Sequence, residues 1–134
     1  MAHDTPADMA ALAKTMMERA YAPYSKFPVG AVVRGANGKL YGGCNVENAA
    51  YPQGACAEAN AIAAMVADGE RRIAEALVMG GGEALITPCG GCRQRLREFA
   101  GGEVPVHLCD PQGKGGTMTV GELLPNSFGP SHLR

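Results

Sequence analysis

The sequence predicts an α/β fold in which helices and strands pack as a layered sandwich. Hydrophobic patterns of helical and of strand type alternate along the chain, and glycine-rich turns separate them. The length of 134 residues, with 46% hydrophobic content, suffices for one core and falls short of two ordinary domains. We therefore expect residues 1–134 to form a single domain.

A helix followed by a β-hairpin is predicted for the N-terminal part. Between positions 9 and 20 the apolar residues recur at helical spacing, and Thr5-Pro6 supplies a cap and a first-turn proline. Two strands then meet at Asn37-Gly38, a pair that accepts the positive φ angles of a tight turn. The strands are expected at residues 29–36 and 39–46. Before them, residues 21–28 hold two prolines and three aromatic side chains, which favour an extended segment that either lines a pocket or packs on the helix.

Helices and strands alternate after the hairpin. One helix is predicted from Cys56 to Ala67, and the next begins at Pro88. A terminal turn of helix is expected at residues 122–125. Strands are expected at residues 73–79, 104–109 and 117–120. Because strands that alternate with helices form βαβ units, this pattern predicts helices layered on a sheet.

The composition restricts the partners. The formal net charge is −1 and the basic residues are scattered, so the chain lacks a basic strip that would bind a polynucleotide. Asp4 and Asp8 argue against an export signal, and no apolar run reaches the length of a membrane span. Five cysteines, an odd number, suit the reducing cytoplasm, where thiols are more often ligands or buried hydrophobes than disulfides. We expect a cytoplasmic protein with a small neutral substrate, no nucleic acid and no membrane.

Two short stretches at predicted helix starts hold the chemistry. Cys56 and Glu58 open one helix, and Cys89 and Cys92, in a Pro-Cys-x-x-Cys motif, open the next. Three converging thiolates leave the fourth tetrahedral position of a zinc ion open to water, and Glu58 is spaced to reach that water without ligating the metal. A lone Cys-x-x-Cys also fits a redox dithiol or half of a structural zinc clip, but neither alternative explains Cys56 together with Glu58.

Such a site needs positive charge around it. Three thiolates on a divalent ion leave a formal charge of about −1, and two helix N-termini aimed at the metal supply roughly +0.5 each. Arg93, adjacent to Cys92, adds a full charge if it hydrogen bonds to a sulfur. The alternative is an ordinary solvated helix arginine beside Arg95 and Arg97.

Asn45 and Glu47 follow the predicted hairpin. They stand two apart, so in an extended backbone they share a face. An amide and a carboxylate together donate to and accept from sugar hydroxyls. The alternative is that both are turn-forming polar residues at a strand end.

These residues lie in stretches that resemble cytidine deaminases of the small, homotetrameric type. The combination of Cys-x-Glu with Pro-Cys-x-x-Cys is typical of zinc deaminases. The resemblance covers nearly the whole chain and is carried by residues 21–27, 43–51, 56–58, 88–94 and 122–125, with Phe128.

The resemblance implies a three-layer α/β/α sandwich around a five-stranded mixed sheet, and the conversion of cytidine and 2′-deoxycytidine to uridine and 2′-deoxyuridine with release of ammonia. It implies one zinc ion per subunit of a homotetramer and a nucleoside substrate. It implies roles for named residues: Cys56, Cys89 and Cys92 as zinc ligands, Glu58 as proton shuttle, Phe27 and Val29 against the pyrimidine, the Ala57 backbone near the base, Asn45 and Glu47 on the ribose 3′-hydroxyl, and Ala49, Tyr51 and Phe128 in a neighbouring subunit's site.

One position departs from the family. Many relatives carry arginine directly after the glutamate, where it bonds to a ligand sulfur, and this chain has Ala59 there. We expect Arg93 and the helix ends to offset the thiolate charge alone, which leaves a more electron-rich zinc with a higher water pKa. The smaller side chain leaves room for bulkier groups at the 4-position of the base, so N4-substituted cytidines are alternative substrates. Among enzymes, a deaminase of another free aminopyrimidine, such as blasticidin S, is the nearest alternative. Outside the enzymes, the alternative is a zinc-stabilised binding module, which requires a fourth protein ligand.

Overall fold

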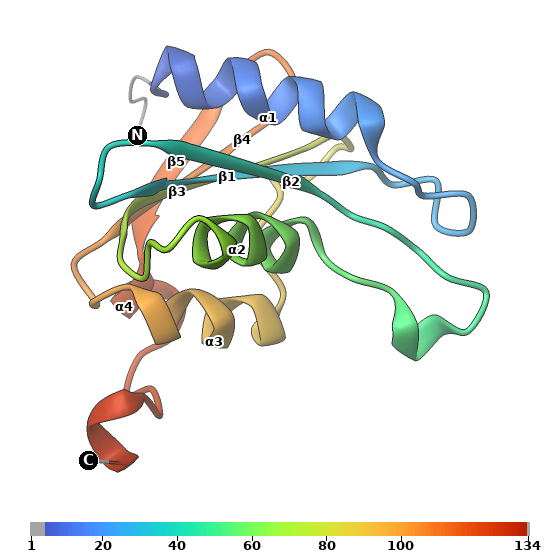
Figure 1. Cartoon of the computed structure of the whole chain (residues 1–134). Helices are drawn as coiled ribbons and strands as arrows, with labels where there is room; N and C mark the ends of the chain where they lie inside the picture. The colour runs from blue at the N-terminus through green and yellow to red at the C-terminus, as the bar shows by residue number, and fades with distance from the viewer. Residues whose placement is uncertain (1–4, 134) are drawn as a thin grey trace.

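The computed structural model describes residues 5–133 as a five-stranded sheet with helices on both faces (Figure 1). In chain order the elements are α1 (Ala7–Arg19), β1 (Val29–Gly35), β2 (Leu40–Cys44), the 3₁₀ turn η1 (Tyr51–Gln53), α2 (Ala57–Ala67), β3 (Ile73–Gly80), α3 (Gly90–Phe99), β4 (Pro105–Cys109), β5 (Gly115–Thr119), α4 (Val120–Leu123) and the 3₁₀ turn η2 (Pro130–Leu133). Figure 1 shows α1 over one face of the sheet and α2 and α3 over the other. The predicted three-layer α/β/α sandwich is confirmed.

The sheet is mixed, with strand order β2-β1-β3-β4-β5. β1 pairs antiparallel with β2 and with β3, β3 pairs parallel with β4, and β4 pairs antiparallel with β5. α3 lies in the crossover between the two parallel strands, as a βαβ unit requires. The carboxyl end of β3 therefore leads directly into the loop that carries the Pro-Cys-x-x-Cys motif.

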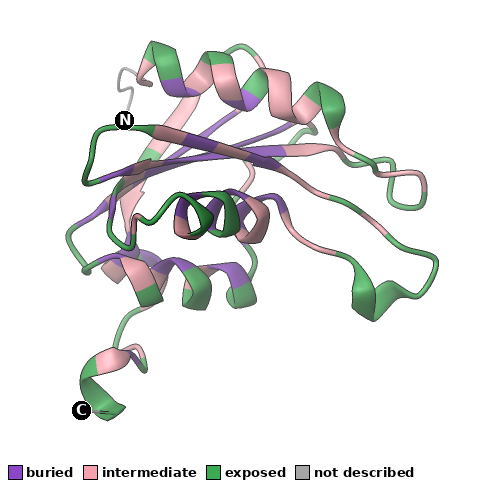
Figure 2. Cartoon of the chain, in the orientation of Figure 1, coloured by how far each residue is buried: buried purple, intermediate pink, exposed green. Residues whose placement is uncertain are grey.

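Strand residues alternate between two apolar cores. Val32, Leu77 and Met79 face α1 and pack with Met9 and Ala13. The intervening strand residues face the other layer, where they pack with residues of α2, α3 and α4. The alternation follows from the two-residue period of a strand, and Figure 2 shows buried residues concentrated along the sheet and the helix sides that meet it.

Two glycines allow helices to touch the sheet directly. A Cβ atom on Gly43 of β2 would lie 2.4 Å from the backbone nitrogen of Ala61 and 2.5 Å from the carbonyl oxygen of Ala57. A Cβ atom on Gly30 of β1 would lie 2.0 Å from the carbonyl oxygen of Ala13 in α1. The backbone of α2 therefore rests on β2 at its first turn, which fixes the position of Cys56.

Several local predictions need correction. Thr5 does not cap α1: Pro6 takes the N-cap position, and Thr5 Oγ1 donates over 3.0 Å to the carbonyl of Gly113 in the β4–β5 turn. The final strand ends at Thr119 rather than at 120, because Thr119 and Glu122 form a reciprocal capping box that starts α4 two residues before the predicted helical turn. The hairpin turn lies at Asn37-Gly38, as predicted. Gly38 has a positive φ angle and Asn37 does not.

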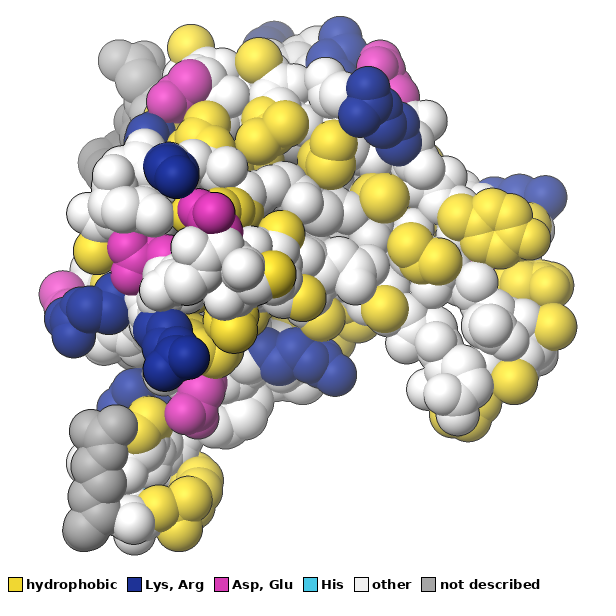
Figure 3. Space-filling view, viewed as in Figure 1, with side chains coloured by type: hydrophobic (Ala, Val, Ile, Leu, Met, Phe, Trp, Pro, Cys, Tyr) yellow, Lys and Arg dark blue, Asp and Glu magenta, His cyan; other side chains and the backbone are white. Residues whose placement is uncertain are grey.

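Two segments project from the layered body. The segment that carries η1 extends beyond the sheet, and η2 near the C-terminus extends in a different direction (Figure 1). Both are largely exposed in Figure 2, and in Figure 3 hydrophobic side chains gather on the projecting η1 segment. Within residues 5–133, no helix is long and apolar enough to cross a membrane.

Candidate active site

Three thiols from two helix starts meet at one point. Cys56 is the N-cap of α2, Cys89 is the N-cap of α3, and Cys92 lies in the first turn of α3. Their Sγ atoms all lie within 4.8 Å of one another. The predicted convergence of these cysteines is confirmed.

The arrangement fits a tetrahedral metal site. Zinc–sulfur bonds of about 2.3 Å at tetrahedral angles place sulfurs roughly 3.8 Å apart, which is compatible with the observed spacing. Both N-cap residues have extended backbone conformations, so each thiol precedes a helix whose positive N-terminal end favours thiolates. Among residues 5–133, this trio is the one group of three or more Cys, His, Asp or Glu side chains whose ligand atoms lie close enough to share a metal ion. Three thiol ligands would leave one tetrahedral position of a bound zinc for a non-protein ligand.

Glu58 lies beside the thiols and away from bulk water. It sits in the first turn of α2, and only 6% of its surface is exposed. Burial raises the pKa of the Glu58 carboxyl, against the smaller opposing influences of a backbone hydrogen bond, a hydrogen bond with Cys92 and the Arg95 charge. Such a carboxyl holds a proton more readily than a solvated glutamate does, which suits a group that takes up and releases protons.

A cleft of about 280 Å³ opens over these groups. Its walls come from the segment before β1, from the first turn of α2 and from the loop before α3. The lining residues include Phe27, Val29, Asn45, Ala57, Glu58 and the three cysteines, together with Ile86 and Thr87, which sequence reasoning missed. The volume lies just below the roughly 300–1,000 Å³ that is usual for a ligand site.

The Asn45 side chain holds one wall of the cleft in place. Its Oδ1 accepts from the backbone nitrogen of Val29 over 2.8 Å, and its Nδ2 donates to the carbonyl of Phe27 over 3.0 Å. The amide retains one donor hydrogen and one acceptor lone pair beyond these two bonds. Asn45 therefore fixes Phe27 and Val29 and still offers both hydrogen-bonding functions to a ligand.

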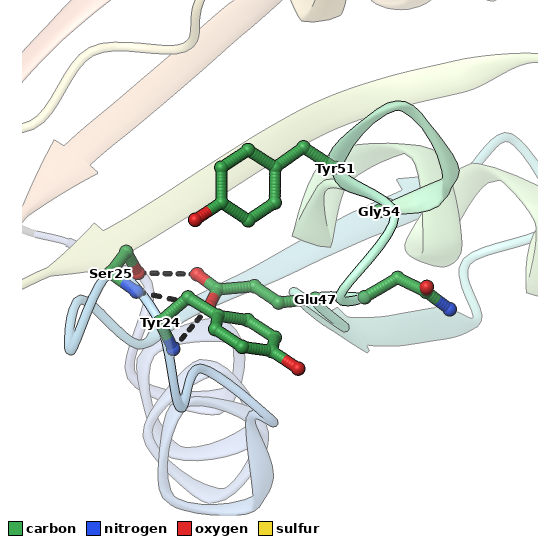
Figure 4. Close-up of a pocket in the computed structure, with 6 residues that line it drawn as sticks. Tyr24, Ser25, Glu47, Tyr51 and Gly54 are labelled. Carbon is green, nitrogen blue, oxygen red and sulfur yellow. Dashed lines mark hydrogen bonds between the residues drawn. The ribbon is translucent and has the colours of Figure 1, made fainter.

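Glu47 lies in an adjoining pocket that shares Ser25 with the cleft. Its Oε1 accepts from the backbone nitrogens of Tyr24 and Ser25 over 2.9 and 3.1 Å, and its Oε2 accepts from Ser25 Oγ (Figure 4). These bonds, that from the Ser25 hydroxyl first among them, lower the pKa of the Glu47 carboxyl. The Tyr24 and Tyr51 rings line the same pocket, with centroids 6.0 Å apart. Residues 21–28 were expected either to line a pocket or to pack on the first helix, and Tyr24 and Phe27 do line pockets.

The guanidinium that meets a candidate ligand sulfur belongs to Arg95, so the predicted bond from Arg93 to sulfur is wrong. Arg95 Nη1 donates to Cys92 Sγ over 3.7 Å. Arg93 instead donates from Nε to the Pro88 carbonyl over 2.8 Å and from Nη1 to the Leu123 carbonyl over 3.0 Å. The reason is helical geometry, because residues three apart share a face whereas neighbours point about 100° apart. That spacing from Cys92 was the signal by which the sequence could have identified Arg95.

The remaining predicted residues lie away from the thiols. Ala49 and Tyr51 are on the projecting η1 segment, and the Tyr51 ring is 75% exposed. Phe128 is 56% exposed, stacks on His132 with ring centroids 5.0 Å apart, and is tied to α3 by a 2.9 Å bond from Gln94 Nε2 to its carbonyl. Neither Ala49 nor Phe128 is among the residues that line the cleft.

Comparison with known proteins assigns the family. Residues 4–108 match the model of the cytidine and deoxycytidylate deaminase zinc-binding region. The chain belongs to the cytidine deaminase family. All three converging cysteines and Glu58 fall inside the matched residues, so the zinc-binding region of this family coincides with the thiol cluster.

Similarity to individual cytidine deaminases extends over most of the chain. The cytidine deaminase of Sporosarcina psychrophila is 43% identical over 120 residues, which are 90% of this chain and 88% of that protein. That of Halalkalibacterium halodurans is 38% identical over 111 residues, 83% of this chain and 84% of that protein. The crystal structure of cytidine deaminase from Burkholderia pseudomallei has a TM-score of 0.87 at 40% identity and covers 92% of this chain and 99% of its own.

Proposed function

We propose that the protein is a zinc-dependent cytidine deaminase that hydrolyses cytidine and 2′-deoxycytidine to uridine and 2′-deoxyuridine with release of ammonia. The observation that carries the proposal is the convergence of three thiols and one buried carboxyl in a single cleft. Cys56, Cys89 and Cys92 would hold the metal. A zinc ion bound there would supply Lewis acidity that makes a water molecule nucleophilic near neutral pH.

Glu58 moves the protons of the reaction in this proposal. Its carboxylate takes a proton from the attacking water and delivers it to N3 of the pyrimidine as the oxygen bonds to C4. It then carries the second proton to the amino group, which leaves as ammonia while the C4 carbonyl forms. Water supplies both hydrogens gained by the leaving group and the ring, so the sum is cytidine plus water to uridine plus ammonia.

The cleft and its adjoining pocket would bind the nucleoside in two parts. Phe27 and Val29 offer an apolar wall for the pyrimidine, and the Ala57 backbone lies in the same cleft. Asn45 keeps a free donor and a free acceptor, and the Glu47 carboxylate has lone-pair capacity beyond its three bonds. A ribose 3′-hydroxyl would accept from Asn45 and donate to Glu47.

Neighbouring subunits would complete the site in a homotetramer of single-domain chains. Ala49 lies just before η1, Tyr51 lies within it, and Phe128 lies just before η2. The exposed aromatic side chains of Tyr51 and Phe128 favour burial against another copy. Co-expression of Glu58→Gln and Phe128→Ala chains tests this sharing, because a mixed oligomer contains sites with an intact Glu58 and an intact neighbouring Phe128. We expect activity above that of either parent. Activity no higher than that of the better parent would contradict shared sites.

The alternatives receive less support. Ala59 lines a groove between α2 and α3 with Arg95, and it is not among the residues that line the cleft, so its small size gives no room at the 4-position of a bound base. A binding module stabilised by zinc requires four protein ligands, and the trio found within residues 5–133 offers three. On the face shown in Figure 3, Lys and Arg side chains are dispersed among acidic ones, which supports a nucleoside over a nucleic acid. We place the enzyme in the cytoplasm, where its five thiols stay reduced.

Metal analysis combined with an ultraviolet assay of cytidine tests the proposal. We expect about one zinc per chain, and conversion of cytidine to uridine by the wild-type protein. Glu58→Gln serves as the matched control, because it keeps the side-chain volume and the three thiols. It should retain zinc and lose turnover. Zinc-loaded protein that leaves cytidine and 2′-deoxycytidine unchanged would overturn the proposed function.

A further inference from the structure

The guanidinium of Arg95, on the outer face of α3, reaches the thiol cluster. Arg95 is exposed, yet its Nη1 donates over 3.7 Å to the sulfur of Cys92, whose side chain is fully buried. Of the three thiols, Cys92 is the least exposed to water, and it is the one with a guanidinium beside it. Among the described residues, 5–133, Arg95 is the one charged donor bonded to a sulfur of the trio.

The first turn of α3 makes this contact possible. Long side chains on a helix lean toward its N-terminus, so a residue at position 95 covers the turn that holds residues 91 and 92. A Cβ atom on Gly91 would lie 3.3 Å from Arg95 Nη1, which is tighter than an ordinary contact. The missing side chain at Gly91 leaves room for the guanidinium beside this turn, where it reaches Cys92.

The neighbouring helix leaves the space for it. Arg95 lines a groove between α2 and α3 whose opposite wall includes Ala59, the residue directly after Glu58. A long side chain at position 59 would share this groove with the guanidinium. The small Ala59 side chain and the absent Gly91 side chain therefore act together, because each removes atoms that would compete with Arg95 for the same place.

We propose that Arg95 is a positioning residue for the metal centre, whose charge stabilises the Cys92 thiolate and offsets the excess negative charge of three thiolates on one zinc. The proposal rests on the proposed function, since it takes the trio as zinc ligands. One guanidinium brings the formal charge of the ion and its three thiolates from about −1 to about zero. Arg95 does so from α3 without touching substrate.

The test measures the metal rather than the reaction. Arg95→Met removes the charge and keeps an unbranched apolar side chain in place of the aliphatic part of arginine. Arg95→Lys keeps the charge without the planar guanidinium. Arg97→Met is the matched control, because Arg97 lies on the same helix and donates to Ser127 Oγ over 3.0 Å instead of to a sulfur. Zinc affinity is measured by competition with a chromophoric chelator. The sulfur-to-metal charge-transfer absorption of each cobalt-substituted protein reports the electron density on the thiolates.

We expect Arg95→Met to weaken zinc binding roughly tenfold, the lower end of the range for outer-sphere partners because this bond is near the surface. Its charge-transfer band should move to longer wavelength, since a thiolate without its hydrogen bond is easier to oxidise. Arg95→Lys should retain most of the affinity, and Arg97→Met should match the wild type in both measurements. If Arg95→Met fails to fold, Arg95→Gln is measured in its place.

Two results would overturn the role of Arg95. One is an affinity and a spectrum of Arg95→Met that equal those of Arg97→Met. The other is an Arg95→Lys variant as weak as Arg95→Met, which would mean that charge is not the cause. Both outcomes are independent of turnover: protein that binds zinc but does not deaminate cytidine would overturn the proposed function and leave these measurements valid.

Discussion

Replacement of Gly43 by alanine tests how the sheet positions the active site. The new Cβ atom would lie 2.4 Å from the backbone nitrogen of Ala61, and ordinary contacts begin near 3.4 Å, so the backbone of α2 must retreat by about 1 Å. Backbone atoms cannot swing aside as a flexible side chain does. Overpacking of this kind costs about 1–3 kcal/mol in the free energy of unfolding. For a chain of this size we expect the melting temperature to fall by roughly 3–15 °C.

The same shift should impair catalysis. Cys56 and Glu58 lie at the start of α2, and a displacement of about 1 Å in a catalytic group lowers the rate roughly 100-fold. Scanning calorimetry and the ultraviolet assay of cytidine measure the two effects. Gly116→Ala is the matched control, because a Cβ atom there meets no atom within 4 Å. Equal melting temperatures and equal kcat for the two variants would refute the contact between β2 and α2.

Three further predictions follow from the site and the sheet. Glu58→Gln should bind as much zinc as the wild type and lose at least roughly 100-fold in kcat, because it removes a proton carrier rather than a ligand; an unchanged kcat in a steady-state assay would exclude the shuttle. Asn45→Ala should raise KM for cytidine more than it lowers kcat. The variant loses the two hydrogen bonds that hold Phe27 and Val29 in the cleft wall, and it loses the proposed contact to the sugar. An unaltered KM would argue against Asn45 both as a support of the wall and as a sugar ligand. Burial raises the pKa of Glu75, but its 2.8 Å bonds to His107 and Arg34 outweigh burial and hold that pKa below the usual 4.5. The stability that Glu75 contributes is therefore present above pH 4.5 and is lost as the pH falls through the pKa of the folded state. The free energy of unfolding in urea should depend less on acid pH for Glu75→Gln than for the wild type, and the same pH dependence in both would contradict this.

The thiol cluster was predictable because each part of it is local in sequence. A cysteine at a helix start, and two more three residues apart at the next, define their own directions once the helices exist. The hydrophobic periods likewise placed most helices and strands to within two residues. Where strand ends were wrong, as at Thr119, a side-chain capping bond decided between strand and helix.

Contacts between distant segments were not predictable. The Glu47 carboxylate accepts three bonds from Tyr24 and Ser25, which lie more than 20 residues earlier, and no spacing in the sequence indicates this. The choice between Arg93 and Arg95 had a different cause. Adjacency to Cys92 favoured Arg93, whereas the helical period favours Arg95. Because α3 already begins at Gly90, residues 92 and 95 share a helix face, and Arg95 bonds to the sulfur.

The most direct test of the central claim is X-ray absorption spectroscopy at the zinc edge of the purified protein. Three thiolate ligands with one position left for water predict three sulfur neighbours at about 2.3 Å and one lighter neighbour at about 2.0 Å. The same spectrum of a Cys92→Ser variant should lose one sulfur neighbour. A shell of four sulfurs, or of two sulfurs with nitrogen neighbours, would contradict the assignment of Cys56, Cys89 and Cys92 as an open zinc site.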